Sequence, residues 1–100
     1  SAESDKENRA LAEVKVEGKQ IIAMIQEALN TDKALLNKNE INLINKSINE
    51  LTKMLEQSDR NHIEQKITHL NEVTADFAER RMDYSINKAL AGKKIDTLEL

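Results

Sequence analysis

The side chains best suited to chemistry in this sequence gather in its second half. His62 and His69 are the two histidines, and seven positions on a helix would separate them by roughly 10 Å along its axis. Paired helical metal ligands usually lie four positions apart, and the sequence has no cysteine to complete a tetrahedral set. We therefore interpret both histidines as surface residues and predict no metal site.

Acidic and basic side chains alternate beyond His69. They are Glu72, Asp76, Glu79, Arg80, Arg81, Asp83 and Lys88. At helical spacing they form both like and unlike pairs, which is typical of a solvated helix face. A catalytic carboxylate pair would also need a cleft, and a small helical domain offers little of one. We predict no catalytic residue in this group.

Other function classes are disfavoured by what the sequence lacks. Its two glycines, Gly18 and Gly92, lie too far apart to build a phosphate-binding loop, so we expect no nucleotide or other cofactor. The net charge of −3 and the short basic run at 92–95, without neighbouring aromatic residues, argue against nucleic acid. No apolar run approaches the roughly 20 residues of a membrane span.

The elements that carry these residues are predicted to be three helices. The sequence has no proline, 33% charged and 2% aromatic residues, and is rich in helix-forming types. Apolar residues at spacings of three and four predict a first helix over about 5–31. Gly18 within it is either a tolerated surface glycine or the place of a bend or close helix contact.

Start signals define the other two helices. Asn37 and Glu40 match a capping box, which predicts a helix over about 38–57. Asp59 is a candidate N-cap for a third helix over about 60–91, either continuous or broken between Thr74 and Glu79. Gly92 is then expected to end that helix, leaving residues 92–100 as a tail.

Short connections predict an all-α fold, an antiparallel three-helix bundle with a long N-terminal helix and an extended or bent C-terminal helix. The second helix would extend roughly 30 Å and the third roughly 48 Å, so helices should overhang the bundle at both ends. The predicted core comprises Ile21, Ile25, Leu29, Leu36, Ile41, Ile44, Ile48, Leu51, Leu55, Ile63, Ile67, Leu70 and Phe77.

The overhangs are the candidate contact sites. On the first helix we select Leu11, Val14, Val16 and Gly18 as candidates for contact with a partner or for self-association into a homo-oligomer. The other overhang carries apolar side chains as well, at Met82, Tyr84, Ile86 and Leu90.

Two stretches of the sequence resemble a known family. "NRALAEVKVEGKQIIAMIQEAL" followed by "DKALL" resembles the C-terminal helical lid of DnaK-type heat-shock chaperones. "DFAERRMDYSINKALAG" at 76–92 is similar to the closing helix of the HscA branch, which serves iron–sulfur cluster assembly. The resemblance covers essentially the whole chain, and its C-terminal motif is the specific part.

The resemblance implies a role within a longer, cytoplasmic chaperone. This chain would be a lid over a peptide-binding β-sandwich, with ATP and magnesium bound in a separate ATPase domain of the parent. The implied partners are the parent's β-sandwich, a client iron–sulfur scaffold protein and a J-type co-chaperone. The alternative is a free-standing helical protein-interaction module.

Two departures from the family pattern stand out. Acidic and histidine side chains latch the first lid helix to the sandwich in general DnaK-type chaperones, but the corresponding positions here are near Lys19 and Ala23. The latch is therefore not carried over to this chain. The sequence also ends in "TLEL" instead of the acidic motif of cytosolic eukaryotic relatives.

Overall fold

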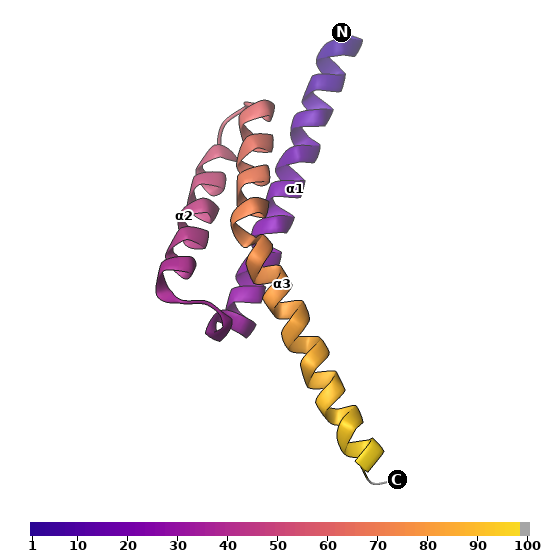
Figure 1. Ribbon diagram of the computed structural model, residues 1–100. Coiled ribbons are helices and arrows are strands. Elements are labelled where there is room, and N and C mark those ends of the chain that lie inside the picture. The colour runs from indigo at the N-terminus through magenta and orange to yellow at the C-terminus, as the bar shows by residue number, and fades with distance from the viewer. Residues whose placement is uncertain (99–100) are drawn as a thin grey trace.

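The computed structural model describes the backbone of residues 1–98 and the side chains of residues 1–93. This part of the chain folds into three α-helices and contains no strand (Figure 1). They are α1 (Ala2–Asp32), α2 (Lys38–Met54) and α3 (Arg60–Leu98), and a 3₁₀ turn, η1 (Lys33–Leu35), follows α1. The prediction of an all-α antiparallel bundle is confirmed.

The helices differ greatly in length, and this sets the shape. α1 and α3 have 31 and 39 residues, whereas α2 has 17. α2 runs antiparallel to the other two, so α1 projects beyond the bundle at its N-terminal end and α3 projects at the opposite end (Figure 1). The molecule measures 69 × 31 × 17 Å as a result.

The core lies where all three helices run side by side. Its buried apolar side chains are Val14, Ala28, Ile44, Ile48, Leu51, Ile63, Ile67, Leu70 and Phe77. Of the other residues predicted for the core, Ile21, Ile25, Leu29, Leu36 and Leu55 are partly buried and pack against this cluster. Ile41 is only partly buried and lies outside the cluster.

Side-chain caps start the second and third helices. The backbone N–H of Glu40 donates to Asn37 Oδ1 at 2.8 Å, and the N–H of Asn37 donates to Glu40 Oε1 at 2.9 Å. This is the predicted capping box. At α3 the N–H of His62 donates to Asp59 Oδ1 at 3.1 Å, so Asp59 acts as the predicted N-cap.

The predicted C-terminal ends of α2 and α3 are wrong. α2 stops at Met54 because the chain tightens there, with the N–H of Gln57 donating to the carbonyl of Met54. α3 does not end at Gly92, which lies inside the helix without a positive φ. An internal glycine costs only about 1 kcal/mol, and no proline follows to stop the helix. Of the predicted tail 92–100, only residues 99–100 fall outside the described backbone.

Of the two alternatives for the third helix, continuous or broken between Thr74 and Glu79, the structure shows the continuous one. Its path still changes direction where it leaves the bundle (Figure 1). The buried Thr74 lies near this point, and its hydroxyl donates to the carbonyl of Leu70 at 2.8 Å. Such back-bonding by threonine often bends a helix without interrupting it.

One buried polar atom in the described core has no partner. Ser47 is 2% exposed and its Oγ makes no hydrogen bond. We expect Ser47→Ala to raise the free energy of unfolding by about 1 kcal/mol, because it removes an unsatisfied hydroxyl without changing the backbone. Urea denaturation followed by far-UV circular dichroism measures this, and a loss of stability would mean that the hydroxyl has a partner in solution.

Candidate functional site: the outer face of the first helix

The four contact candidates on α1 do not lie together on its surface. Val14 and Gly18 are buried in the bundle, and Leu11 is partly buried and packs against the core. Only Val16 is exposed, with 54% of its surface accessible. The expectation that Leu11 and Val14 lie uncovered on an overhang is therefore wrong, and the contact candidate Gly18 is buried as well. The bundle extends further along α1 than the length of α2 suggested.

Gly18 packs closely against side chains at the end of α2. A Cβ atom placed on Gly18 would lie 2.9 Å from Leu55 Cδ2 and 3.7 Å from Ile67 Cδ1. A methyl group at this position would therefore press on Leu55. Of the two alternatives for Gly18, the structure supports a close helix contact over a tolerated surface glycine.

What α1 offers to a partner is the side that faces away from the bundle. Ala12, Val16, Gln20 and Met24 are all exposed and follow one another at four-residue intervals. We call these four residues the α1 outer face. Val16 and Met24 are its large apolar members, at 54% and 69% exposed. Since the helix rises 1.5 Å per residue, the face extends about 18 Å.

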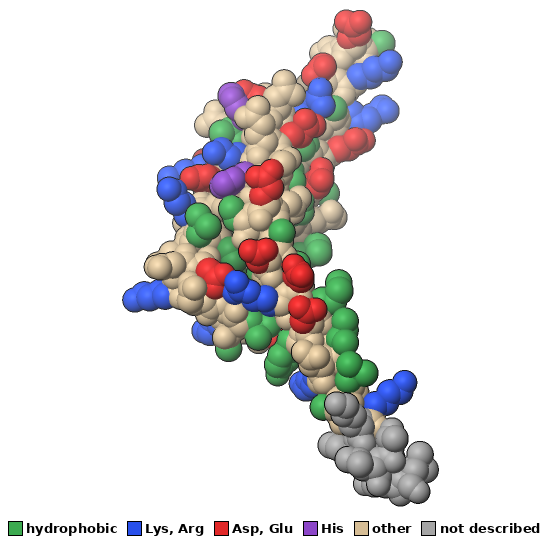
Figure 2. All heavy atoms as spheres, viewed as in Figure 1, with side chains coloured by type: hydrophobic (Ala, Val, Ile, Leu, Met, Phe, Trp, Pro, Cys, Tyr) green, Lys and Arg blue, Asp and Glu red, His purple; other side chains and the backbone are tan. Residues whose placement is uncertain are grey.

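The part of α1 that precedes Leu11 is polar. Its residues 2–9 are exposed and mostly charged or polar. Figure 2 shows acidic and basic side chains on this projecting end, whereas hydrophobic side chains lie along the projecting part of α3. The N-terminal overhang is thus polar, and the exposed apolar surface of α1 lies at the level of the bundle.

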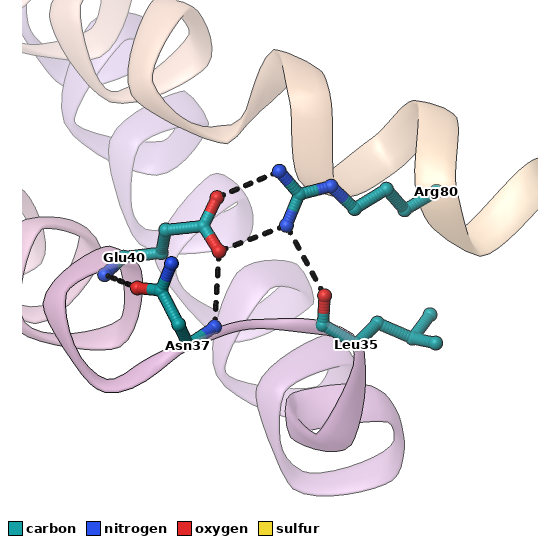
Figure 3. A network of polar contacts seen from close by, with 4 residues as sticks. All are labelled: Leu35, Asn37, Glu40 and Arg80. Carbon is teal, nitrogen blue, oxygen red and sulfur yellow. Dashed lines mark hydrogen bonds and ion pairs between the residues drawn. The ribbon is translucent and has the colours of Figure 1, made fainter.

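Two arginines of α3 hold the C-terminal end of α1 in place. Arg80 forms two parallel contacts with Glu40, Nη1 to Oε1 at 2.9 Å and Nη2 to Oε2 at 2.8 Å, and also donates to the carbonyl of Leu35 at 3.1 Å (Figure 3). Arg81 donates from Nε to Asp32 Oδ2 at 2.8 Å, and its guanidinium lies 5.9 Å from the centre of the Phe77 ring.

Both arginine side chains stay about two-fifths exposed, as expected of a solvated face, but each also contacts another element of the fold, which the sequence did not predict. They tie the end of α1, the η1 turn and the start of α2 to α3, and we call the pair the arginine clamp. The sequence contained a signal for it. Arg80 and Arg81 lie one turn after Phe77, at the end of the core. They meet the C-terminal end of α1 there, and the last carbonyl groups of a helix have no partners within that helix.

The clamp and the cap both act on the Glu40 carboxylate. The pKa of Glu40 is lowered from its ordinary value of 4.5, mainly because its carboxylate accepts a hydrogen bond from the Arg80 guanidinium. The hydrogen bond from the N–H of Asn37 lowers this pKa further. The N–H of His62 similarly lowers the pKa of Asp59. A lowered pKa favours the charged carboxylate in the folded state, so this stabilisation is present above the unfolded-state pKa and is lost as the pH falls through the folded-state value.

We therefore expect the chain to lose stability on acidification below pH 4.5, the ordinary pKa of Glu40. Glu40→Gln should lower the thermal midpoint at neutral pH, and the difference from the wild type should narrow as the wild-type carboxylate becomes protonated. Thermal denaturation of both proteins at a series of pH values from neutral downwards measures this difference in thermal midpoint. A difference that stays constant through the acidic range would contradict the proposed charge interaction.

The histidines do not form a chemical centre. His62 Nδ1 lies 2.6 Å from Asp59 Oδ2, at the start of α3, and His69 lies on the same helix in a shallow surface depression lined by residues that include Glu64, Gln65 and Glu72. Within the described part of the chain, no group of three or more acidic or histidine side chains could hold a metal ion.

None of the described helices combines the length and the apolar character needed to cross a bilayer.

The positions that correspond to the family's latch lie beside the α1 outer face. Lys19 and Ala23 line a shallow groove between α1 and α2, together with Ile22, Gln26, Thr52, Leu55 and Glu56. Neither offers a carboxylate or an imidazole. A partner on this side would meet the lysine, the methyl group of Ala23 and the apolar members of the outer face.

The helical architecture and the sequence together define the class of protein. The family model described as "Hsp70 protein" matches residues 1–83, so the chain belongs to the Hsp70 chaperone family. Within that family it is similar to HscA. It is 41% identical over 98 residues to the chaperone protein HscA homolog of Mannheimia succiniciproducens, covering 98% of this chain and 16% of that protein.

Other relatives agree. The HscA homolog of Tolumonas auensis is 43% identical over 96 residues, covering 95% of this chain and 16% of the relative. The chaperone protein HscA of Yersinia enterocolitica is 41% identical over 96 residues, with 96% and 16% covered. The resemblance to the HscA branch is thus confirmed. The chain spans 16% of the length of these curated relatives.

Proposed function

We propose that this chain is the lid subdomain of an HscA-like chaperone and closes over a peptide-binding β-sandwich in the rest of that protein. Its membership of the Hsp70 family and its similarity to HscA support this assignment. Family membership also weighs against the alternative, a helical interaction module unrelated to chaperones. The larger depressions on the described helices are shallow, which is consistent with an extended peptide being held elsewhere.

The observation that carries the proposal is the α1 outer face. Val16 and Met24 present apolar surface on the side of α1 opposite the bundle, and a helix with one free apolar face is suited to lie across another domain. The bundle and the arginine clamp fix the other side and the C-terminal end of α1. α1 would therefore move together with the bundle as one rigid cover.

The activity and partners of the longer protein belong to the same proposal. By its similarity to HscA, the parent would be a cytoplasmic ATP-dependent chaperone in the maturation of iron–sulfur proteins, with ATP and magnesium bound outside this chain. A J-type co-chaperone and an iron–sulfur scaffold protein would be its partners. This chain would act as a non-enzymatic part that slows the release of bound peptide.

Removing the lid tests the proposal directly. In the longer chaperone, deletion of these 100 residues is expected to speed the dissociation of a fluorescein-labelled extended apolar peptide, because the cover over the binding site is lost. Stopped-flow fluorescence anisotropy measures the rate. An unchanged dissociation rate would remove the lid assignment.

A point variant tests the α1 outer face separately. Val16→Asp in the longer chaperone should speed peptide dissociation at least about threefold, because a carboxylate would be buried against the sandwich. Leu43→Asp is the matched control, since Leu43 is 49% exposed on α2, away from the outer face. Equal rates for the two variants would exclude the outer face as the contact surface.

A further inference from the structure

The projecting part of α3 carries an apolar surface that the lid proposal does not use. Residues 82–93 are all exposed, and Figure 1 shows this part of the helix leading away from α1 and α2. Met82, Ile86 and Leu90 are 64%, 49% and 51% exposed. They follow one another at four-residue intervals and form a line that we call the α3 stripe. Figure 2 shows hydrophobic side chains along this part of α3.

The bundle of the same chain cannot cover the α3 stripe. Ile86 lies nine residues after the buried Phe77, and at 3.6 residues per turn this places it on the opposite side of the helix. Met82 and Leu90 lie on either side of it, one turn away in each direction. Within the described part of the chain, therefore, no segment is placed to cover the stripe.

Two charged residues at the ends of the stripe, Glu79 and Lys93, lie at equal distances from Ile86 and have opposite signs, whereas the nearer Asp83 and Lys88 are not placed symmetrically. Glu79 lies seven residues before Ile86, and Lys93 lies seven residues after it. Seven residues are close to two helical turns, so both charges lie on the same side of the helix as Ile86. The stripe thus has an acidic end near the bundle and a basic end far from it.

We infer that the α3 stripe binds the α3 stripe of a second copy of this chain, with the two helices antiparallel and Ile86 on the two-fold axis. Antiparallel pairing about Ile86 places Met82 of each copy opposite Leu90 of the other. It also places each Glu79 opposite Lys93 of the other copy, so both charge pairs are attractive. Parallel pairing would set Glu79 against Glu79, which is repulsive.

This arrangement closes on itself. Both copies use the same surface, so the contact is isologous and yields a dimer, not a filament. The stripe from Met82 to Leu90 is only about 12 Å long, so the buried area falls below that of a stable protein–protein interface. A reversible dimer with a dissociation constant between about 10 µM and 1 mM is expected.

The first experiment measures association of the 100-residue chain by sedimentation equilibrium from 10 µM to 2 mM, concentrations set roughly by the expected affinity. The wild type should show a monomer–dimer equilibrium. Ile86→Asp should weaken it at least about tenfold, because two carboxylates would meet on the two-fold axis. Tyr84→Asp is the matched control. Tyr84 is 48% exposed on the same segment but lies about 200° around the helix from Ile86, so the change should be less than about threefold.

A charge exchange tests the orientation. Glu79→Lys and Lys93→Glu should each weaken the dimer several-fold, and the double variant should restore affinity to within about twofold of the wild type. All these positions are exposed on the projecting part of the helix or just before it, so the bundle should stay folded, as far-UV circular dichroism verifies. A monomeric wild type at 2 mM, an unchanged dimer in Ile86→Asp, or a double variant no tighter than the singles would overturn the inference.

Discussion

Phe77→Ala is expected to lower the free energy of unfolding by about 3–5 kcal/mol. Phe77 is 3% exposed and is the last large side chain of the core before α3 leaves the bundle. Its removal leaves a cavity next to Leu36 and Val73, which a short bundle cannot close without moving a helix. It also removes the ring beneath the Arg81 guanidinium and so weakens the arginine clamp.

The chain contains its own control for this experiment. Tyr84 is the other aromatic residue, seven positions further along α3, and it is 48% exposed. Tyr84→Ala should change the free energy of unfolding by no more than about 0.5 kcal/mol. Urea denaturation of both variants gives the comparison. A loss under about 1 kcal/mol for Phe77→Ala would mean that this end of the bundle is open in solution.

Gly18→Val should destabilise the chain by about 1–3 kcal/mol, although valine is a better helix former than glycine. The cause is the contact with Leu55 Cδ2, 2.9 Å from the position of a Cβ atom, with Leu51 Cδ1 and Ile67 Cδ1 each at 3.7 Å. A branched side chain would force α1 away from the end of α2. This overpacking exceeds the gain in helix propensity.

Smaller substitutions separate the two effects. Gly18→Ala should be nearly neutral, because the gain of about 1 kcal/mol in helix propensity is offset by displacement of the flexible end of Leu55. Gly92→Ala is the matched control, since no atom lies within 4 Å of a Cβ at that position, and it should not destabilise. Thermal and urea denaturation measure the series. A Gly18→Val variant as stable as the wild type would show that α1 and α2 separate at low cost.

Local patterns sufficed to predict where the second and third helices start. Asn37 with Glu40 and Asp59 with His62 form the expected caps, because a cap depends on only a few neighbouring residues. The ends were harder to place. Gly92 resembles a helix stop in sequence, yet nothing forces it into a left-handed conformation and α3 runs through it to Leu98.

The contact site was predicted less well than the bundle. Apolar spacing identified Val14, Val16 and Gly18 as notable, but spacing alone does not show how far a neighbouring helix reaches along α1. Burial of Val14 and Gly18 depends on the end of α2 and the start of α3 meeting α1 at this level. Val16 is exposed because it points the other way.

The arginine clamp also depends on the tertiary structure and not on local sequence. Charges at helical spacing favoured a solvated face for Arg80 and Arg81, since each helix was considered alone. In the fold the two arginines contact Glu40, Leu35 and Asp32, which lie 40 or more positions away in the sequence. The sequence by itself determined the three helices, their caps, their apolar stripes and the kinship to HscA, because these depend on local order along the chain. Only the tertiary structure decided which apolar residues are covered and which charged residues pair between elements, because both depend on how far one helix extends beside another.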